Sequence, residues 1–261
     1  MESKVLVDRD EHVLVLTINR PRVRNAVDAD VCALIGTALE EAEHDSEVRC
    51  VVLTGAGEAS FSSGADLKAI ARGERLVPEG MEQWSFAGFV RHFTSKPTIA
   101  AVNGTALGGG MELALACDLV VAVESAVFGL PEVKRGLVAA AGGAFRITRA
   151  LPPKIAMELL MTGAPLTASD AAAWGLVNHV VPDGTALAKA MEIARVISAN
   201  APLAVQATKR IAYGAREGAP AGEDTLWDLS DAEVSGVYAS EDAQEGPRAF
   251  AEKRAPVWRA R

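Results

Sequence analysis

Within a long apolar, glycine-rich stretch over residues 97–137, Glu112 and Glu132 lie in surroundings typical of a protein interior. A carboxylate removed from water without partners is costly and usually has a raised pKa. A fold that keeps two such groups is therefore expected to use them for proton transfer. The alternative is a helix N-terminal carboxylate, stabilised by free backbone N–H groups. That alternative is favoured for one glutamate alone, whereas the pair, together with the glycines at 108–110, favours proton transfer.

Runs of aliphatic and β-branched residues alternate with helix-like segments in the first half of the chain. Buried strands closed by turn signals are expected at residues 13–18, 49–54, 98–102 and 119–123. A helix capped by Asp28 or Asp30 is expected to end near Glu43, and another is expected to begin at Gly109 and Gly110. This alternation predicts an α/β fold.

The pattern becomes mostly helical after Glu132. Helices are expected at about residues 143–150, 153–161, 168–174, 186–200, 203–215 and 224–238, and a short strand at 177–181. The predicted organisation is an α/β core over residues 1–200, followed by a helical region over residues 201–261.

The charge balance limits the kinds of partner that the chain can bind. The formal net charge is −8, and no long basic run offsets this general field. This argues against nucleic acid or acidic lipid as a partner. An anionic ligand must therefore be met by local lysines or arginines.

Cysteine usage and the apolar segments point to a cytoplasmic protein. Cys32, Cys50 and Cys117 are odd in number and share no metal-type spacing, so neither a disulfide framework nor a metal site is expected. Acidic residues among the first ten do not fit the basic region of a signal peptide. The most apolar segment, residues 98–130, carries too many polar groups for a membrane span, so we expect it to be buried interior.

A glycine-containing turn after the second expected strand superficially matches a dinucleotide-binding fingerprint. In the segment from Gly55 to Ser60, the third glycine of that fingerprint is replaced by Ser60, and residues 61–64 continue as a loop. The fingerprint requires a helix at that point to receive the pyrophosphate. We therefore expect no dinucleotide cofactor.

Two other loops have the glycines needed for close backbone approach to a ligand. Residues 63–66 and residues 107–110 each lead into an expected helix. Glycine lets the backbone approach closely, and the first N–H groups of a helix have no partner within it. Two such donors converging on one oxygen would form an oxyanion hole. The alternative reading, tight packing, is favoured for Gly110.

Three segments carry a recognisable combination: residues 61–68 (FSSGADLK), 103–112 (NGTALGGGME) and 128–132 (FGLPE). In this order they resemble the signatures of the crotonase (enoyl-CoA hydratase/isomerase) superfamily. Each segment alone is a weak signal, whereas the three together are specific, and the resemblance covers nearly the whole chain. It implies a crotonase-like spiral of ββα units with a C-terminal helical trimerisation region.

The resemblance also implies an activity, that of an enoyl-CoA hydratase, a hydro-lyase. In the family, the N–H groups at the positions of Ala65 and Gly109 form an oxyanion hole for a thioester carbonyl. Glu112 then activates water for attack at C3 of a 2-enoyl thioester, and Glu132 delivers the proton to C2. The acid and base roles reverse with the direction of reaction, and the pair can titrate as one coupled unit.

Coenzyme A is implied as part of the substrate, with no separate cofactor and no metal. The residues expected to bind the coenzyme A thioester are Arg24, Ala26, Ser63, Ala65, Asp66, Leu67, Lys68, Gly108, Phe250 and Lys253. The resemblance further implies a homotrimer or a hexamer built as a dimer of trimers, and a place in fatty acid β-oxidation.

Two alternatives stay open at this point. Where hydratases of the family often have Pro-Gly, this chain has Ala139 and Ala140, and the extra methyl of Ala140 is expected to alter the space around the catalytic water or the acyl chain. Residues 151–153 and 249–258 resemble those of a carnitinyl-CoA dehydratase, which uses the same chemistry. The other alternative is a crotonase-like scaffold without catalysis, since fold alone does not establish function.

Overall fold

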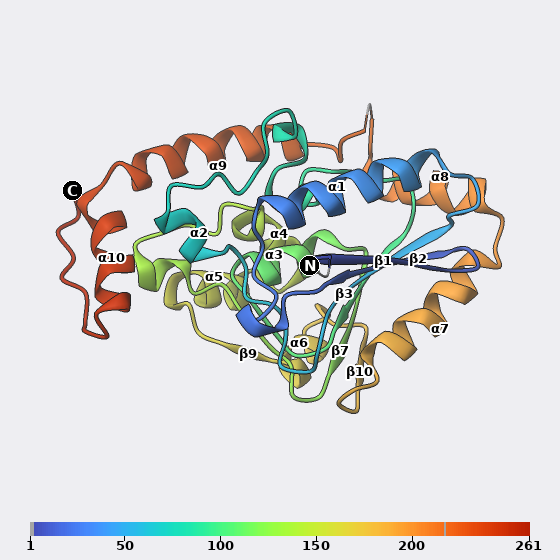
Figure 1. Cartoon of the computed structure of the whole chain (residues 1–261), viewed down its shortest axis with the longest axis horizontal. Helices are drawn as coiled ribbons and strands as arrows, with labels where there is room; N and C mark the ends of the chain where they lie inside the picture. The colour runs from blue at the N-terminus through green and yellow to red at the C-terminus, as the bar shows by residue number, and fades with distance from the viewer. Residues whose placement is uncertain (1–2, 217) are drawn as a thin grey trace.

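The structure, a computed structural model, describes residues 3–216 and 218–261 (Figure 1). The first two residues of the acidic N-terminal segment considered above lie outside this description. The larger sheet has the strand order β1 (Val5–Asp10), β2 (Val13–Ile18), β3 (Cys50–Gly55), β5 (Thr98–Val102), β7 (Leu119–Val123) and β10 (His179–Val181). Its first two strands form an antiparallel pair, and every later neighbour pairs in parallel.

The smaller sheet consists of very short strands in the order β4 (Ser60–Ser62), β6 (Thr105–Leu107), β8 (Val127–Gly129) and β9 (Leu166–Thr167). The chain visits the two sheets in turn. Strand β3 is followed by β4 and helix α2 (Leu67–Ala71), and β5 is followed by β6 and helix α3 (Gly109–Ala116). Strands β7 and β8 then lead to the short 3₁₀ helix η4 (Glu132–Arg135) and helix α4 (Gly143–Ala150). This repetition is the spiral of ββα units that the family resemblance implies.

Helices α1 (Ala29–His44) and α7 (Ala186–Ser198) cover opposite faces of the larger sheet (Figure 1). Helix α1 begins at the predicted cap, because the Asp28 carboxylate accepts the Val31 N–H at 3.1 Å. Its Ile35 and Leu39, one turn apart, are fully buried and belong to the same core as the strands. Parallel strands covered on both faces read as continuous apolar runs, which is why the sequence identified them.

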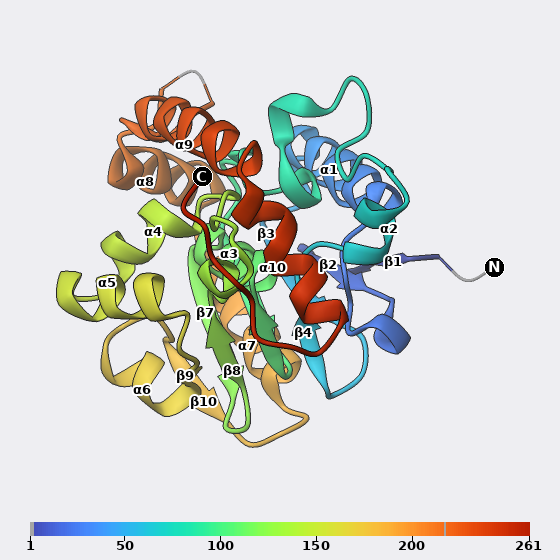
Figure 2. The same cartoon turned by 90° about the vertical axis from the view of Figure 1, so that its left-hand side faces the viewer.

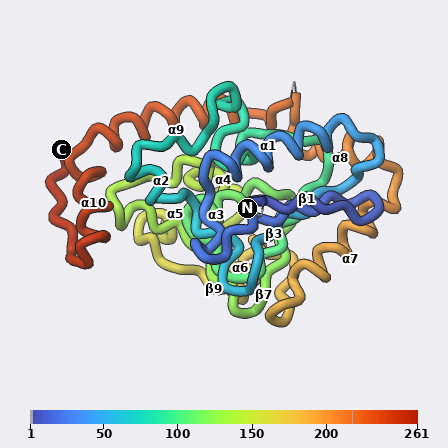
Figure 3. Tube along the Cα trace, viewed as in Figure 1, coloured from blue at the N-terminus to red at the C-terminus, as the bar shows by residue number. Residues whose placement is uncertain are grey.

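The remaining helices are α5 (Pro153–Thr162), α6 (Ala168–Ala173), α8 (Pro202–Tyr213), α9 (Glu223–Tyr238) and α10 (Glu241–Ala251). Helix α9 runs along one side of the molecule and delivers α10 to its end, as the chain trace shows (Figure 3). Seen from that end, α10 crosses in front of α3 (Figure 2). Helix α10 packs on η4, and Gly246 approaches the backbone of Arg135 so closely that no side chain would fit between them.

Most expected elements occur within two residues of their predicted bounds. Strands 13–18, 98–102 and 119–123 coincide with β2, β5 and β7, whereas the strand expected at 177–181 is shorter. It begins only at His179, because the side chain of Asn178 accepts the Val120 N–H at 2.8 Å and ends the regular ladder there. The sequence did not predict β1, the short strands of the smaller sheet, or α10.

The predicted boundary at residue 200 falls between α7 and α8. Helix α9 nevertheless packs on the preceding part of the chain, since Trp227 is buried and meets the Phe145 ring edge-on at 4.9 Å. The division into residues 1–200 and 201–261 therefore stays a prediction. Among the described residues, no helix is both long and apolar enough to cross a membrane.

Candidate active site

Glu112 lies one turn into α3, on its buried face. Strand β6 ends at Leu107, and Gly108 makes the turn into α3 with a φ of 55°, a conformation that favours glycine. The Glu112 side chain is then directed into the interior, where the residue is only 3% exposed. Its Oε1 accepts the backbone N–H of Gly143 at 2.9 Å. The first residue of α4 thus holds the Glu112 carboxylate.

Glu132 reaches the same place from the smaller sheet. Strand β8 ends at Gly129, and Glu132 is the first residue of η4. Its Oε1 lies 3.1 Å from the position that a Cβ on Gly108 would occupy, so the carboxylate lies against the turn into α3. Its Oε2 is buried and accepts no hydrogen bond from the described residues. Such an atom is available to a bound water or substrate.

Burial raises the pKa of both carboxyl groups well above the usual glutamate range. For Glu112 the negative charge of Glu132 adds to this effect, while the Gly143 N–H opposes it. For Glu132 burial is the dominant cause. Because the charge of Glu132 disfavours ionisation of Glu112, the pair can hold one proton near neutral pH, as one carboxylate and one carboxylic acid. This is the combination that general acid–base chemistry requires.

The loop that carries Ala65 lies beside the start of α3. Ala65 forms a parallel bridge with Val27, and the bridge is made by its neighbours. The Val27 N–H donates to the Gly64 oxygen at 2.8 Å, and the Asp66 N–H donates to the Val27 oxygen at 2.9 Å. In such a bridge the central residue's own N–H points away from its partner. The Ala65 N–H is therefore directed away from Val27.

Gly64 brings this loop into contact with Gly109. A Cβ on Gly64, whose φ is 83°, would lie 2.7 Å from the Gly109 nitrogen, so only glycine permits the approach. As the first residue of α3, Gly109 has an N–H without an acceptor inside the helix, and the helix dipole adds partial positive charge there. The two N–H groups and the two carboxylates thus surround the beginning of α3, where an oxyanion and two proton-transfer groups could meet one substrate.

The residues expected to bind coenzyme A divide into two groups. Arg24 and Ser63 are joined, because the Ser63 N–H donates to the Arg24 oxygen at 3.0 Å. This places residues 24–26 beside residues 63–68 and close to Gly108.

Phe250 lies on α10, and Lys253 follows that helix. The Arg135 guanidinium lies 3.5 Å above the centre of the Phe250 ring. The contacts of α10 therefore join this second group to η4, the segment that begins with Glu132.

Sequence reasoning did not identify three residues that border the site. The sequence identified Gly143 only as the start of a helix, although a glycine pair before a helix can signal close approach of the backbone to another group. Phe86 has no sequence signal, yet its ring would lie 2.5 Å from a Cβ on Gly109. Arg20 read as part of a turn, yet it pairs with Asp66 at 2.8 Å.

Known proteins that resemble this chain are named as hydratases or dehydratases of coenzyme A thioesters. The family model described as enoyl-CoA hydratase/isomerase matches residues 8–261. Carnitinyl-CoA dehydratase of Salmonella typhi is 43% identical over the full length of both chains. The crystal structure of carnitinyl-CoA hydratase from Mycobacterium avium is 59% identical, covers 100% of both chains and superposes with a TM-score of 0.99. For enoyl-CoA hydratase from Mycobacterium tuberculosis H37Rv the identity is 46% and the TM-score 0.78, again over 100% of both chains.

Proposed function

Because the chain belongs to the enoyl-CoA hydratase/isomerase family and is a hydratase/dehydratase of that family, we propose that Glu112 and Glu132 catalyse reversible addition of water to a 2-enoyl-CoA thioester. The observation that carries the proposal is the position of these two buried carboxylates beside the N-terminal end of α3. Burying two ionisable carboxyl groups costs free energy that two neutral side chains would avoid, so a purely structural role would be served better by neutral residues.

In the proposed mechanism, the thioester carbonyl accepts hydrogen bonds from the N–H groups of Ala65 and Gly109. When the proton shared by the pair lies on Glu132, Glu112 is a carboxylate and takes a proton from water while the water oxygen bonds to C3. The electron pair of the C2–C3 double bond moves onto the thioester as an enolate, whose charge the two N–H groups stabilise. Glu132, as carboxylic acid, then gives its proton to C2. Dehydration follows the same steps backwards, with the roles of the two glutamates exchanged.

For the acyl group we favour carnitinyl-CoA and its dehydrated form. The support comes from the relatives, because the 59% identical structure is named a carnitinyl-CoA hydratase and the enoyl-CoA hydratase is more distant at 46%. Carnitinyl thioesters carry a quaternary ammonium group on C4, next to the carbon that water attacks. The single negative charge of the glutamate pair is electrostatically compatible with such a cation. A simple short-chain enoyl-CoA is the second candidate, supported by the more distant relative.

The test is turnover by purified protein with two thioesters, crotonyl-CoA and the dehydrated form of carnitinyl-CoA, with water addition followed by loss of enoyl absorbance. Greater kcat/KM for the carnitinyl compound supports the favoured acyl group. Greater kcat/KM for crotonyl-CoA supports the second candidate. A folded protein that turns over neither, even with longer enoyl thioesters, would instead be the non-catalytic scaffold. The Glu112→Gln/Glu132→Gln double variant is the control for background hydration.

Coenzyme A would enter only as part of the substrate, with no separate cofactor. We also propose a cytoplasmic location, and a place in fatty acid β-oxidation if a straight-chain enoyl-CoA proves to be the preferred substrate.

We propose in addition that the protein is a homotrimer or a hexamer. Helix α8 has no buried residue among those described, and Leu203 and Ile211 on it are 76% and 80% exposed. Leu229 on α9 is 57% exposed. Apolar surface of this kind is typical of an interface between subunits. Light scattering at micromolar concentration tests the assembly, and a monomer would contradict it.

A further inference from the structure

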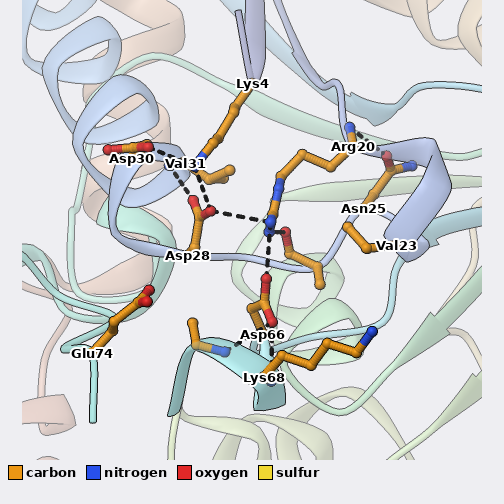
Figure 4. Close-up of polar contacts among 12 residues, drawn as sticks. Lys4, Arg20, Val23, Asn25, Asp28, Asp30, Val31, Asp66, Lys68 and Glu74 are labelled. Carbon is orange, nitrogen blue, oxygen red and sulfur yellow. Dashed lines mark hydrogen bonds and ion pairs between the residues drawn. The ribbon is translucent and has the colours of Figure 1, made fainter. Parts of the chain in front are cut away.

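Arg20 lies between two carboxylates, in a partly buried position (Figure 4). Its Nη2 lies 2.8 Å from Oδ2 of Asp66 and 3.1 Å from Oδ2 of Asp28. Its Nη1 donates to the backbone oxygen of Ala26 at 2.6 Å. The side chains of the three charged residues are only 16%, 11% and 10% exposed, so this cluster is largely withdrawn from solvent screening.

Both carboxylate oxygens of Asp66 accept hydrogen bonds. Oδ1 accepts the N–H groups of Lys68 and Ala69, each at 3.1 Å, and so caps α2. Oδ2 faces Arg20. Burial opposes ionisation of this carboxyl group, but the hydrogen bonds from Arg20 and from the start of α2 hold its pKa below the usual range. Because Ala65 directly precedes Asp66, the direction of the Ala65 peptide depends on how Asp66 is held.

The guanidinium of Arg20 spans the bridge between Val27 and Ala65. One end holds Ala26, the residue before Val27, and the other holds Asp66, the residue after Ala65. The hydrogen bonds of Val27 with Gly64 and Asp66 fix the peptides on either side of Ala65. Arg20 therefore clamps both strands of the bridge from outside, and the Ala65 N–H is left with a single direction.

We infer that Arg20 is a positioning residue for the oxyanion hole. It acts through Asp66 and Ala26, and it aims the Ala65 N–H at the thioester carbonyl without touching the substrate itself. The inference rests on the proposed function, in which that N–H stabilises the enolate. Without Arg20, Asp66 would lose its cationic partner and lie near the Asp28 carboxylate with only Lys4 to offset the two charges, and the loop would move to separate them.

Lys4 provides a matched control within the same cluster. Its Nζ lies 2.7 Å from Oδ2 of Asp28 and 2.5 Å from Oδ2 of Asp30, whereas its contacts do not include Asp66 (Figure 4). Removing Lys4 takes a positive charge from Asp28 but leaves the clamp on the bridge intact. If the cluster acted only through its charge, removal of either cation would change kcat to a similar extent. The positioning role predicts instead that removal of Arg20 lowers kcat and removal of Lys4 does not.

The experiment compares Arg20→Met, Arg20→Lys and Lys4→Met with the wild type. We expect Arg20→Met to lower kcat by about 10- to 100-fold, because a displaced donor loses most of its effect, with a smaller change in KM. The kcat of Arg20→Lys should lie between those of Arg20→Met and the wild type, because an ammonium group can pair with one carboxylate but cannot span the bridge. Lys4→Met should stay within about twofold of the wild type, as expected for the loss of a half-exposed ion pair.

A fourth variant separates positioning from stability. In Arg20→Met/Asp28→Asn one of the facing charges is removed, while asparagine still caps α1. We expect the melting temperature to return toward that of the wild type and kcat to remain low. If both the melting temperature and kcat of the double variant recovered, Arg20 would act only by neutralising charge, and the inference would be wrong. Wild-type kcat in Arg20→Met itself would lead to the same conclusion.

A bound chromophore gives a readout that does not depend on turnover. 4-(Dimethylamino)cinnamoyl-CoA absorbs at longer wavelength when hydrogen bonds polarise its carbonyl. We expect the wild type and Lys4→Met to shift its absorption equally at saturation, and Arg20→Met to shift it less. An equal absorption shift in Arg20→Met and the wild type would overturn the role of Arg20. The same conclusion would follow if the wild type bound the probe without shifting its absorption, or did not bind the probe. Failure of the wild type to hydrate any thioester would instead count against the proposed function.

Discussion

The backbone N–H of Gly143 donates a 2.9 Å hydrogen bond to Oε1 of Glu112, and a Cβ on Gly143 would lie 2.9 Å from both Oε1 and Cγ of the same glutamate. The contact leaves room for no side chain at position 143. It also joins two helices, because Gly143 begins α4 and Glu112 lies in the first turn of α3. The orientation of the proposed base therefore depends on a residue 31 positions away in the chain.

Gly143→Ala should disturb this contact and displace the Glu112 carboxylate. We expect kcat to fall by about 10-fold or more, since a misplaced general base loses much of its effect. The matched control is Gly236→Ala in α9, where a Cβ would meet nothing within 4 Å. That variant should keep full activity and be as stable as the wild type or up to about 1 kcal/mol more stable, because alanine favours the helix. Steady-state kinetics and thermal melts of both variants check the expectation.

Glu112→Gln and Glu132→Gln should each lower kcat by at least about 10²-fold, because each removes a proton-transfer group while keeping the shape of the side chain. Circular dichroism should show that both variants fold. A near-wild-type rate in either one would remove that glutamate from the mechanism. The double variant should be little worse than the worse single variant, since the two groups act on one transition state.

The family, the α/β fold class and the hydratase/dehydratase chemistry were predictable from the sequence, and each is confirmed. Buried parallel strands such as β5 read as continuous apolar runs, and the three motifs carry the family. Strand β1 was missed because Asp8, Arg9 and Asp10 are exposed on the sheet edge and hide its pairing with β2. The strands of the smaller sheet are only two or three residues long, too short for any periodicity.

Helix α10 and the Arg20 cluster depend on tertiary contacts that a single sequence does not encode locally. Gly246 and Pro247 are helix-breaking signals, yet Gly246 is needed where α10 meets the backbone of Arg135. Arg20 and Asp66 are 46 residues apart, and contacts such as the bridge between Val27 and Ala65 bring them together. The roles of the individual site residues stay predictions until the variants are measured.

The buried carboxyl of Glu112 should make stability depend on pH in the direction opposite to that of a salt-bridged carboxylate. Burial, with a contribution from the Glu132 charge, raises its pKa from 4.5 to about 8. Between these values the folded protein binds a proton that the unfolded chain has lost, so the free energy of unfolding falls as the pH rises. The favourable term is fully present below about pH 4.5 and lost above about pH 8.

Glu112→Gln isolates this effect, because glutamine does not titrate and can still accept the Gly143 N–H. The free energies of unfolding of wild type and variant should be compared by denaturant titration at pH 5 and pH 9. Relative to the wild type, the variant should gain at least about 1 kcal/mol in stability between the two pH values, since one unit of pKa shift corresponds to about 1.4 kcal/mol. A constant difference across this range would show that Glu112 ionises normally in the folded protein.

Gly109 and Gly110 are adjacent, yet substitutions at them should fail in different ways. A Cβ on Gly110 would collide with the backbone oxygen of Ser62 in β4, which cannot yield without moving the strand. Gly110→Ala should therefore lower the melting temperature strongly. A Cβ on Gly109 would instead meet the Phe86 ring at 2.5 Å and the Gly64 Cα at 3.2 Å. Because Phe86 is only partly buried, its ring can yield, and the fold should tolerate the change better than at Gly110.

Gly109→Val should abolish turnover even though both glutamates are present, because the branched side chain would enter the space where the thioester carbonyl is proposed to meet the Gly109 N–H. The informative measurement is kcat beside melting temperature for the two glycine variants. Gly109→Val/Phe86→Ala serves as the control for the clash with the ring: it should recover stability but not activity. Full activity in a folded Gly109→Val variant would contradict the oxyanion assignment and remove the main mechanistic support for a thioester substrate.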